Sequence, residues 1–320
     1  MRLLLLLFLS LSICFRCLAQ GCSDAGFCTM GAMKPDQPYN KKIKIKLRSI
    51  EFSQYYGLTH FNNHIYVSTL EANIGIGKKY VAQAKIPYQV AHGHLGTFQS
   101  LSDISLSLTR NVVSTETFDI NITVGTKIPS NNGDKQQLNG LSLPMYYQTS
   151  LGTNDIVIGA SIISRQWLFA VGYQQALNKN QNGFWWAEWQ QDRPQDFSYI
   201  SQYAQSNNLQ RGKDVMLRIE RNFRLARFNA SIGLLPIYRL TKDIVSIPDI
   251  NHRDDPSFNT VKKVDSSDGL ALSGIYTIGY NFNVRSGIKL LVGNKFSQRG
   301  KNPDGLSREF VTSFTYSYRF

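Results

Sequence analysis

The chain lacks a long hydrophobic run anywhere after its first twenty residues. No later stretch approaches the roughly 18 consecutive apolar residues that a transmembrane helix requires, so a helical membrane protein is excluded. Its proline, glycine and charged residues are too few for a disordered chain. With 320 residues, the sequence has the length of one large domain.

Sequence patterns for catalysis and metal binding are missing too. The five histidines are scattered, and the closest pair, His92 and His94, has no cysteine or acidic residue beside it, so we interpret both as loop residues. No glycine-rich phosphate loop is present, and no set of serine, histidine and aspartate stands out. We therefore expect neither an enzyme nor a bound metal or cofactor.

Cysteine is scarce, and its placement suggests export. Residues 1–19 have a short basic start and an apolar run of about a dozen residues, which predicts a secretory signal cleaved after Ala19. A lipid anchor at Cys22 is a weaker alternative. Cleavage would remove two of the four cysteines and leave Cys22 and Cys28. In an exported chain such a pair favours a disulfide, and two unrelated thiols are the alternative.

The carboxyl-terminal strand carries the most informative pattern that is present. Aromatic residues share one parity, and small or polar residues share the other. The aromatic set is Phe310, Phe314, Tyr316, Tyr318 and Phe320. Side chains of a strand point alternately to opposite faces. An aromatic face with a polar face behind it is typical of an outer-membrane barrel, in which one face meets lipid and the other the lumen.

Similar alternation predicts an all-β protein, a closed antiparallel transmembrane barrel of twelve strands. The expected strands are 41–56, 62–73, 78–90, 97–110, 116–129, 152–163, 165–178, 213–223, 226–240, 268–281, 284–296 and 307–320. Long connections follow odd-numbered strands, which places 130–151, 179–212 and 241–267 outside the cell. The connection 179–212 could hide a further hairpin, which would make fourteen strands. Residues 20–40 remain as a periplasmic or lumenal segment before the barrel, 41–320.

The formal charge is +13 at pH 7, and a basic chain often binds nucleic acid. Because this chain is expected to be exported, we do not expect nucleic acid as its partner. We instead expect outer-membrane lipid and lipopolysaccharide, and a small solute in the lumen. Charge on the lipid face is costly, so cations on the polar parity should line the lumen and favour anions. The candidate solute-binding cations are Lys42, Lys44, Lys46, Arg48, Lys127, Arg218 and Lys289. The alternative is that they pair with acids and fill the barrel wall.

Three tryptophans gather in the longest connection. Trp185, Trp186 and Trp189 could capture an apolar solute at the outer surface. They could also belong to the aromatic girdle at the membrane interface, or simply pack the loop. The second interpretation is the one that the composition favours.

Several short motifs resemble a known group. Lys127-Ile128-Pro129-Ser130 ends one expected strand, Leu101–Ile104 begins another, and Leu151–Gly159 begins a third. Their order is similar to that in FadL-like outer-membrane barrels of the phenol meta-pathway type, although Ser130 replaces the usual threonine and the following glycine is missing. The segment 21–28 resembles the mature start of such proteins from Bacteroidetes. The resemblance implies passage of hydrophobic or aromatic compounds and an amino-terminal plug in the lumen.

These observations together favour an outer-membrane channel for passive uptake of small hydrophobic, aromatic or amphipathic solutes, anionic ones included. Two other functions stay open. One is an outer-membrane lipid hydrolase, and the other is a structural or secretion-partner barrel without transport. Fold alone does not decide among them.

Overall fold

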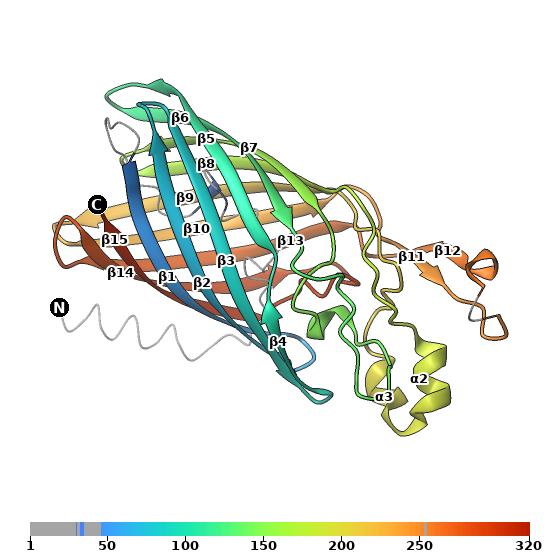
Figure 1. The fold of residues 1–320 in the computed structure, drawn as a ribbon. Helices are drawn as coiled ribbons and strands as arrows, with labels where there is room; N and C mark the ends of the chain where they lie inside the picture. The colour runs from blue at the N-terminus through green and yellow to red at the C-terminus, as the bar shows by residue number, and fades with distance from the viewer. Residues whose placement is uncertain (1–29, 31–32, 35–45, 253–254) are drawn as a thin grey trace.

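The computed structural model describes residues 30, 33–34, 46–252 and 255–320, and it forms one closed barrel (Figure 1). The first half of the barrel contains β1 (Lys46–Leu58), β2 (His64–Ile76), β3 (Tyr80–Gly93), β4 (Gly96–Leu101), β5 (Ile104–Ser114), β6 (Phe118–Ile128) and β7 (Asp155–Ser164). The second half contains β8 (Trp167–Ala176), β9 (Asp214–Leu225), β10 (Phe228–Arg239), β13 (Gly269–Asn281), β14 (Ser286–Ser297) and β15 (Phe310–Arg319).

Antiparallel pairing runs around the whole barrel and joins its ends. The last strand pairs with the first, from Phe310 opposite Leu58 to Arg319 opposite Ser49. Both β4 and β5 pair with β3, so they are two halves of one interrupted strand. Counting them once turns the thirteen strands of the sheet into twelve. The predicted twelve-stranded closed barrel is confirmed, and closure leaves no strand edge unpaired in lipid.

Alternation along the strands sets which side chains face outward. In β15 the side chains of Phe314 and Tyr316 are exposed, whereas those of Thr315 between them and of Val311 earlier in the strand are buried. The same alternation holds in the middle of β5 and β6. The exposed residues there are Leu106, Leu108, Ile122 and Val124, and the buried ones are Ser105, Ser107 and Thr123. The outer surface is thus an apolar belt suited to lipid tails.

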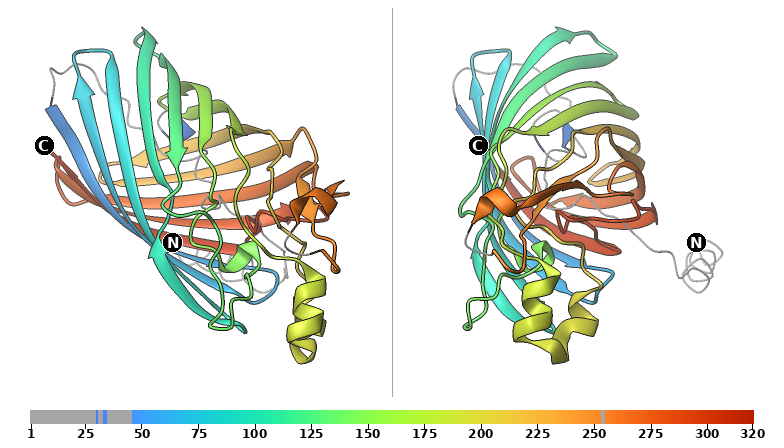
Figure 2. Two further views of the ribbon diagram at one scale, coloured as in Figure 1. Left: turned by 45° about the vertical axis from the view of Figure 1, so that its right-hand side comes forward. Right: turned by 90° about the vertical axis from the view of Figure 1, so that its right-hand side faces the viewer.

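The long connections gather at one end of the barrel, opposite the carboxyl terminus (Figures 1 and 2). They contain η3 (Met145–Tyr147), α2 (Trp186–Asp192), η4 (Pro194–Asp196), α3 (Phe197–Ile200), the hairpin of β11 (Ile244–Ile247) and β12 (Thr260–Lys263), and η5 (Pro256–Phe258). The connection 179–212 holds short helices and no extra barrel hairpin, so the fourteen-strand alternative is wrong. Among the described residues, no helix is long and apolar enough to cross a membrane.

The orientation of the barrel gives a direct test. The structure places 130–151, 179–212 and 241–267 at the same end, as their position after odd-numbered strands predicts. A short epitope inserted after Asn139 or Lys242 should therefore be labelled by antibody on intact cells. An epitope in the turn at Ala226 is the matched control and should be labelled only after the membrane is permeabilised. The reverse labelling pattern would contradict the orientation.

Candidate functional site

Three described residues from the amino-terminal segment lie inside the barrel, and we call Met30, Met33 and Lys34 the plug residues (Figure 2). Met30 and Met33 are fully buried among apolar side chains of the inner wall. The inner wall there departs from the expected polar lining. Its apolar members are Val157, Ile163, Leu168, Ala170, Met216, Leu235 and Ile275.

Two inward glycines give the plug methionines their room. A Cβ built on Gly125 would overlap Met30 Sδ, and one built on Gly159 would overlap Met33 Sδ. Glycine lowers strand stability because it packs no side chain, so an inward glycine often marks a close approach by another segment. The glycines of β6 and β7 thus leave the space that the two plug methionines fill.

Charges hold the third plug residue. Lys34 Nζ lies 2.9 Å from a carboxylate oxygen of Glu51 and 2.5 Å from one of Glu71. Lys85 Nζ lies 3.4 Å from the other oxygen of Glu71, and Asn73 donates a hydrogen bond of 2.8 Å to the same carboxylate. Buried charges are tolerated when they are paired and hydrogen-bonded in this way. The plug is thus fixed by shape and by charge.

The predicted lumen cations fall into different environments. Lys127 is buried and lies 3.5 Å from Asp103, while Arg218 is buried and donates to Glu220 over 3.1 Å. Both therefore match the alternative in which cations pair with acids. Lys289, opposite Thr315, lies on the inward parity of β14 and is half-buried. It is the better candidate of the three for a passing solute.

Four predicted lumen cations at the start of the barrel form what we call the cation ladder: Lys42, Lys44, Lys46 and Arg48. Lys42 and Lys44, like Cys22 and Cys28, lie outside the described residues, and so does the expected signal 1–19. Lys46 begins β1 opposite Gly75, and the pairing of β1 shifts between Leu47 and Ser49. This bulge lets Arg48 stand beside Gly75 although Ile50, two residues later, is exposed on the outer face.

A larger set of buried charges lies at the loop end of the barrel, and we call it the mouth cluster. Its members are Asp155, Arg211, Asp214, Arg239, Asp243, Arg299 and Asp304. Arg239, the last residue of β10, is the centre. Its guanidinium lies 2.8 Å from both Asp214 and Asp243 and 2.7 Å from Asp304. The acids come from the barrel rim and from two different loops, so Arg239 ties the loops to the wall.

The other two arginines of the mouth cluster also pair with its acids. Arg211 Nη1 lies 2.7 Å from Asp155, and Arg299 lies 3.6 Å from Asp304. Burial alone would raise the pKa of Asp304, but the guanidinium groups of Arg239, Arg299 and Arg211 outweigh it and hold that pKa well below the ordinary value for a carboxyl group. Asp304 is therefore ionised, and the cluster contains three cations and four acids with almost balanced charge.

The loops above the mouth have an aromatic core of their own. Trp189 is buried beside Phe184, and its Nε1 donates 2.9 Å to the carbonyl of Ser142. Trp185 is buried as well. These two tryptophans lie in the loops rather than on a membrane strand, which supports the loop-packing interpretation over capture or an interface girdle. Trp186 differs, because it lines a cavity.

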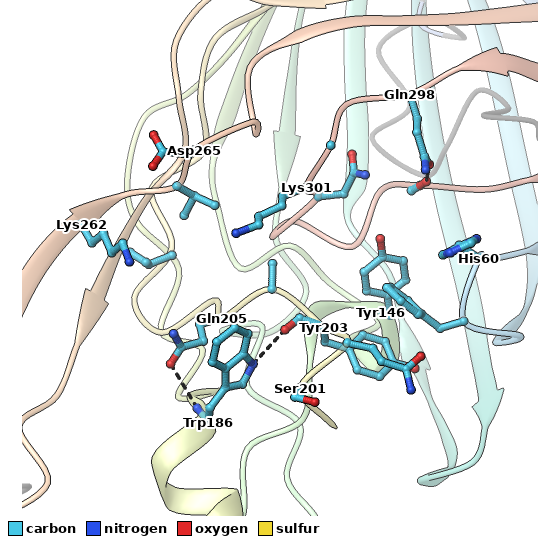
Figure 3. Close-up of a pocket in the computed structure, with 18 of the residues that line it drawn as sticks. His60, Tyr146, Trp186, Ser201, Tyr203, Gln205, Lys262, Asp265, Gln298 and Lys301 are labelled. Carbon is cyan, nitrogen blue, oxygen red and sulfur yellow. Dashed lines mark hydrogen bonds between the residues drawn. The ribbon is translucent and has the colours of Figure 1, made fainter. Parts of the chain in front are cut away.

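That cavity, the loop pocket, has a volume of about 460 Å³ and opens among the long connections (Figure 3). Five connections contribute to it, from the first between β1 and β2 to the last before β15. Its lining residues include Phe61, Tyr146, Trp186, Tyr203, Gln205, Val245, Ile247, Lys262, Val264, Asp265, Lys301 and Ser307. Burial raises the pKa of the Tyr146 phenol, so this side chain stays neutral.

Sequence reasoning missed most of these features, and some could have been found. The inward glycines Gly125 and Gly159 break the side-chain pattern of their strands, which was a readable signal. The mouth cluster had none, since its acids are far apart in sequence and meet only in the fold. In the described part of the chain, no group of three histidine, cysteine or acidic side chains is placed to hold a metal ion.

Comparisons with known proteins give the fold and little more. No protein-family model and no curated protein matches the chain. Among solved structures, the chain is similar to the COG4313 outer membrane channel from Pseudomonas putida F1. The TM-score is 0.57 at 9% identity, over 89% of this chain and 99% of that one. An identity this low establishes the fold alone.

Weaker similarities include a channel and an enzyme. The NanC porin matches with a TM-score of 0.44 at 9% identity, over 85% of this chain and 98% of that one. Outer membrane phospholipase A from Escherichia coli matches with a TM-score of 0.39 at 9% identity, over 86% and 98%. Scores of this size support no conclusion about activity. The strand count, the closure and the apolar belt identify the chain as a twelve-stranded β-barrel of the outer membrane.

Proposed function

We propose that the protein is an outer-membrane channel for passive uptake of small hydrophobic, aromatic or amphipathic solutes, anionic ones included. The observation that carries the proposal is the stacking of three features along one barrel: a loop pocket, the mouth cluster below it and plug residues in the lumen. Such a series suits a narrow, gated route better than a wide porin. The motifs that resemble FadL-like barrels of the phenol meta-pathway type point to the same solutes.

The mechanism needs no chemical step. A solute would leave water for the loop pocket, pass the mouth cluster when the loops move, and travel along the inner wall past the plug. Each barrier is built from contacts that can break and re-form, so flow follows the concentration gradient. Lys289, half-buried on the inner face of β14, would meet the solute on this route.

The cation ladder offers a test of charge selectivity. Replacing Lys42, Lys44, Lys46 and Arg48 by glutamine keeps length and polarity but removes four positive charges. If they raise the potential of the lumen, uptake of benzoate into liposomes should fall severalfold relative to neutral benzyl alcohol. For the unaltered protein, the preference should weaken as salt rises, because the screening length drops from about 10 Å at 0.1 M to about 3 Å at 1 M.

The control for that test is the same replacement of Lys78 and Lys79, which lie in the β2–β3 turn. It should leave the benzoate preference unchanged. An unaltered ratio in the fourfold variant, with the barrel still folded, would limit the ladder to a structural role.

The alternative function, lipid hydrolysis, can be separated from transport by an assay. The histidine rings that hydrogen-bond in the structure do so with Tyr56, Thr97, Glu309 and Asp249. These bonds join loops and strand ends, and they give hydrolysis no support. Release of fatty acid from phospholipid vesicles by purified protein, lost in a His60→Ala variant, would favour the hydrolase over the channel.

A further inference from the structure

We propose that the loop pocket is a binding site for an aromatic carboxylate, held with its ring against Trp186 and its carboxylate between Lys301 and Lys262. The inference rests on the proposed function, since it names the class of solute that the channel collects. The barrel fold alone specifies neither this binding site nor the chemical class of its ligand.

The lower wall of the pocket provides a flat apolar surface. The Trp186 indole is held in place at both ends, because its Nε1 donates 2.9 Å to the carbonyl of Tyr203 and its backbone N–H donates 3.1 Å to Gln205 Oε1. Phe61 and Tyr203 line the same pocket, and the ring centroids of these two residues lie 4.4 Å from each other. Rings prefer offset or tilted stacking on such surfaces, so a planar aromatic ligand is favoured over a branched one.

Aliphatic side chains complete the apolar part. Val245 and Ile247 come from β11, and Val264 follows β12. They line the same cavity as the aromatic residues, and its volume of about 460 Å³ has room for a ligand with one or two fused rings. Apolar walls with a few polar groups are typical of small-molecule sites.

Positive charge is concentrated at the rim. Lys301 and Lys262 line the pocket and are exposed, and neither forms a salt bridge in the described part of the chain. The one acid among the lining residues, Asp265, lies 2.7 Å from Lys242, and the charges of Lys262 and Lys301 also act on it, so the cations outnumber the acid at this rim. Figure 3 shows the Lys301 side chain extending into the space framed by Trp186, Tyr146 and Lys262. Two ammonium groups beside an apolar wall select a ligand with one anionic end.

The position of the pocket links binding to passage. Tyr146 and Ser307 line its inner side, and Ser307 is close in sequence to Asp304 of the mouth cluster. Gly305, with a left-handed φ of +67°, packs on the backbone of Met145, where an added Cβ would lie 2.6 Å from the carbonyl carbon. A ligand in the pocket therefore contacts the same loop that closes the mouth.

Binding can be measured without transport. We would titrate 2-naphthoate and neutral 2-naphthalenemethanol into detergent-purified full-length protein by calorimetry. The double variant Lys262→Gln/Lys301→Gln should weaken naphthoate binding at least tenfold and leave the neutral alcohol unchanged. Lys263→Gln is the matched control, because Lys263 lies on the same strand β12 outside the pocket. Trp186→Leu should weaken both ligands, since it removes the surface for the ring.

The outcomes separate the site from the channel. Equal naphthoate affinity in the wild type and the lysine double variant, or equal affinity of the wild type for the two ligands, would overturn the proposed site. Uptake of naphthoate into liposomes is measured on the same samples. Naphthoate binding that needs both lysines, without uptake, would retain the site and reject the channel. Uptake in the wild type and the double variant alike, together with naphthoate binding that is indifferent to these lysines, would retain the channel and reject the site.

Discussion

Replacing Arg239 by methionine should open the outer mouth of the barrel and raise its single-channel conductance severalfold. The single guanidinium of Arg239 contacts three buried acids, Asp214, Asp243 and Asp304, at 2.7–2.8 Å. Removing one partner of a buried ion pair costs about 3–5 kcal/mol, because the opposing charge is left uncompensated. All three acids would lose their nearest cation at once, although Arg211 and Arg299 would remain within 3.9 Å of Asp214 or Asp304. Loop movement into water would relieve the remaining penalty, which is greatest at Asp243.

The strands should survive this change. Arg239 is the last residue of β10, so the ladder of hydrogen bonds in the membrane does not depend on its side chain. The loops 240–268 and 298–309 should detach, because Asp243 and Asp304 belong to them. Planar-bilayer recordings give the conductance, and limited proteolysis gives the exposure of loop 240–268. Heat-modified gel mobility checks that the barrel is folded.

A neighbouring ion pair supplies the control. Lys242 lies 2.7 Å from Asp265, with both side chains well exposed. Exposed pairs of this kind add little to stability, so Lys242→Met should change neither conductance nor proteolysis. An Arg239→Met channel with wild-type conductance and intact loops would show that the mouth is held by the aromatic loop core instead.

The sequence predicted the barrel well because its physics is local. Lipid on one face and polar groups on the other impose a period of two residues, and that period can be read within a single strand such as 310–319. Strand boundaries also followed from it to within a few residues in most strands. The interruption between β4 and β5 was not predicted, although the alternation breaks there, where two buried polar residues, Ser102 and Asp103, follow the exposed Leu101.

The functional site was harder to predict because its contacts are distant in sequence. Lys127 and Arg218 were placed on the inner wall from parity alone, yet whether each cation is free or paired depends on Asp103 and Glu220. Parity showed the direction of the side chain and not its partner. Trp186 and Trp189 are three residues apart, but one lines the pocket and the other is buried. That difference depends on how separate loops pack together.

Displacing a plug residue should have the second large effect on conductance. Gly159→Val should displace Met33 from the inner wall and raise conductance, because an added Cβ meets only Met33 among its nearest neighbours, with Cε at 2.9 Å and Cγ at 3.0 Å. The added side chain takes the seat of the methionine, and an interior packed at crystal density has no room for both. Bilayer recordings should show a larger or noisier current than in the wild type.

A second substitution shows whether the plug causes the change. Met33→Ala in the Gly159→Val background shortens the side chain that clashes, so the plug can return and conductance should fall back toward the wild-type value. Gly279→Ala is the matched control, since a Cβ at that inward glycine meets the side chain of Asn229 and no plug residue. If conductance stays high in the double variant, the valine acts by distorting β7 itself. Full reversal would instead identify Met33 as a part of the barrier that passing solutes must displace.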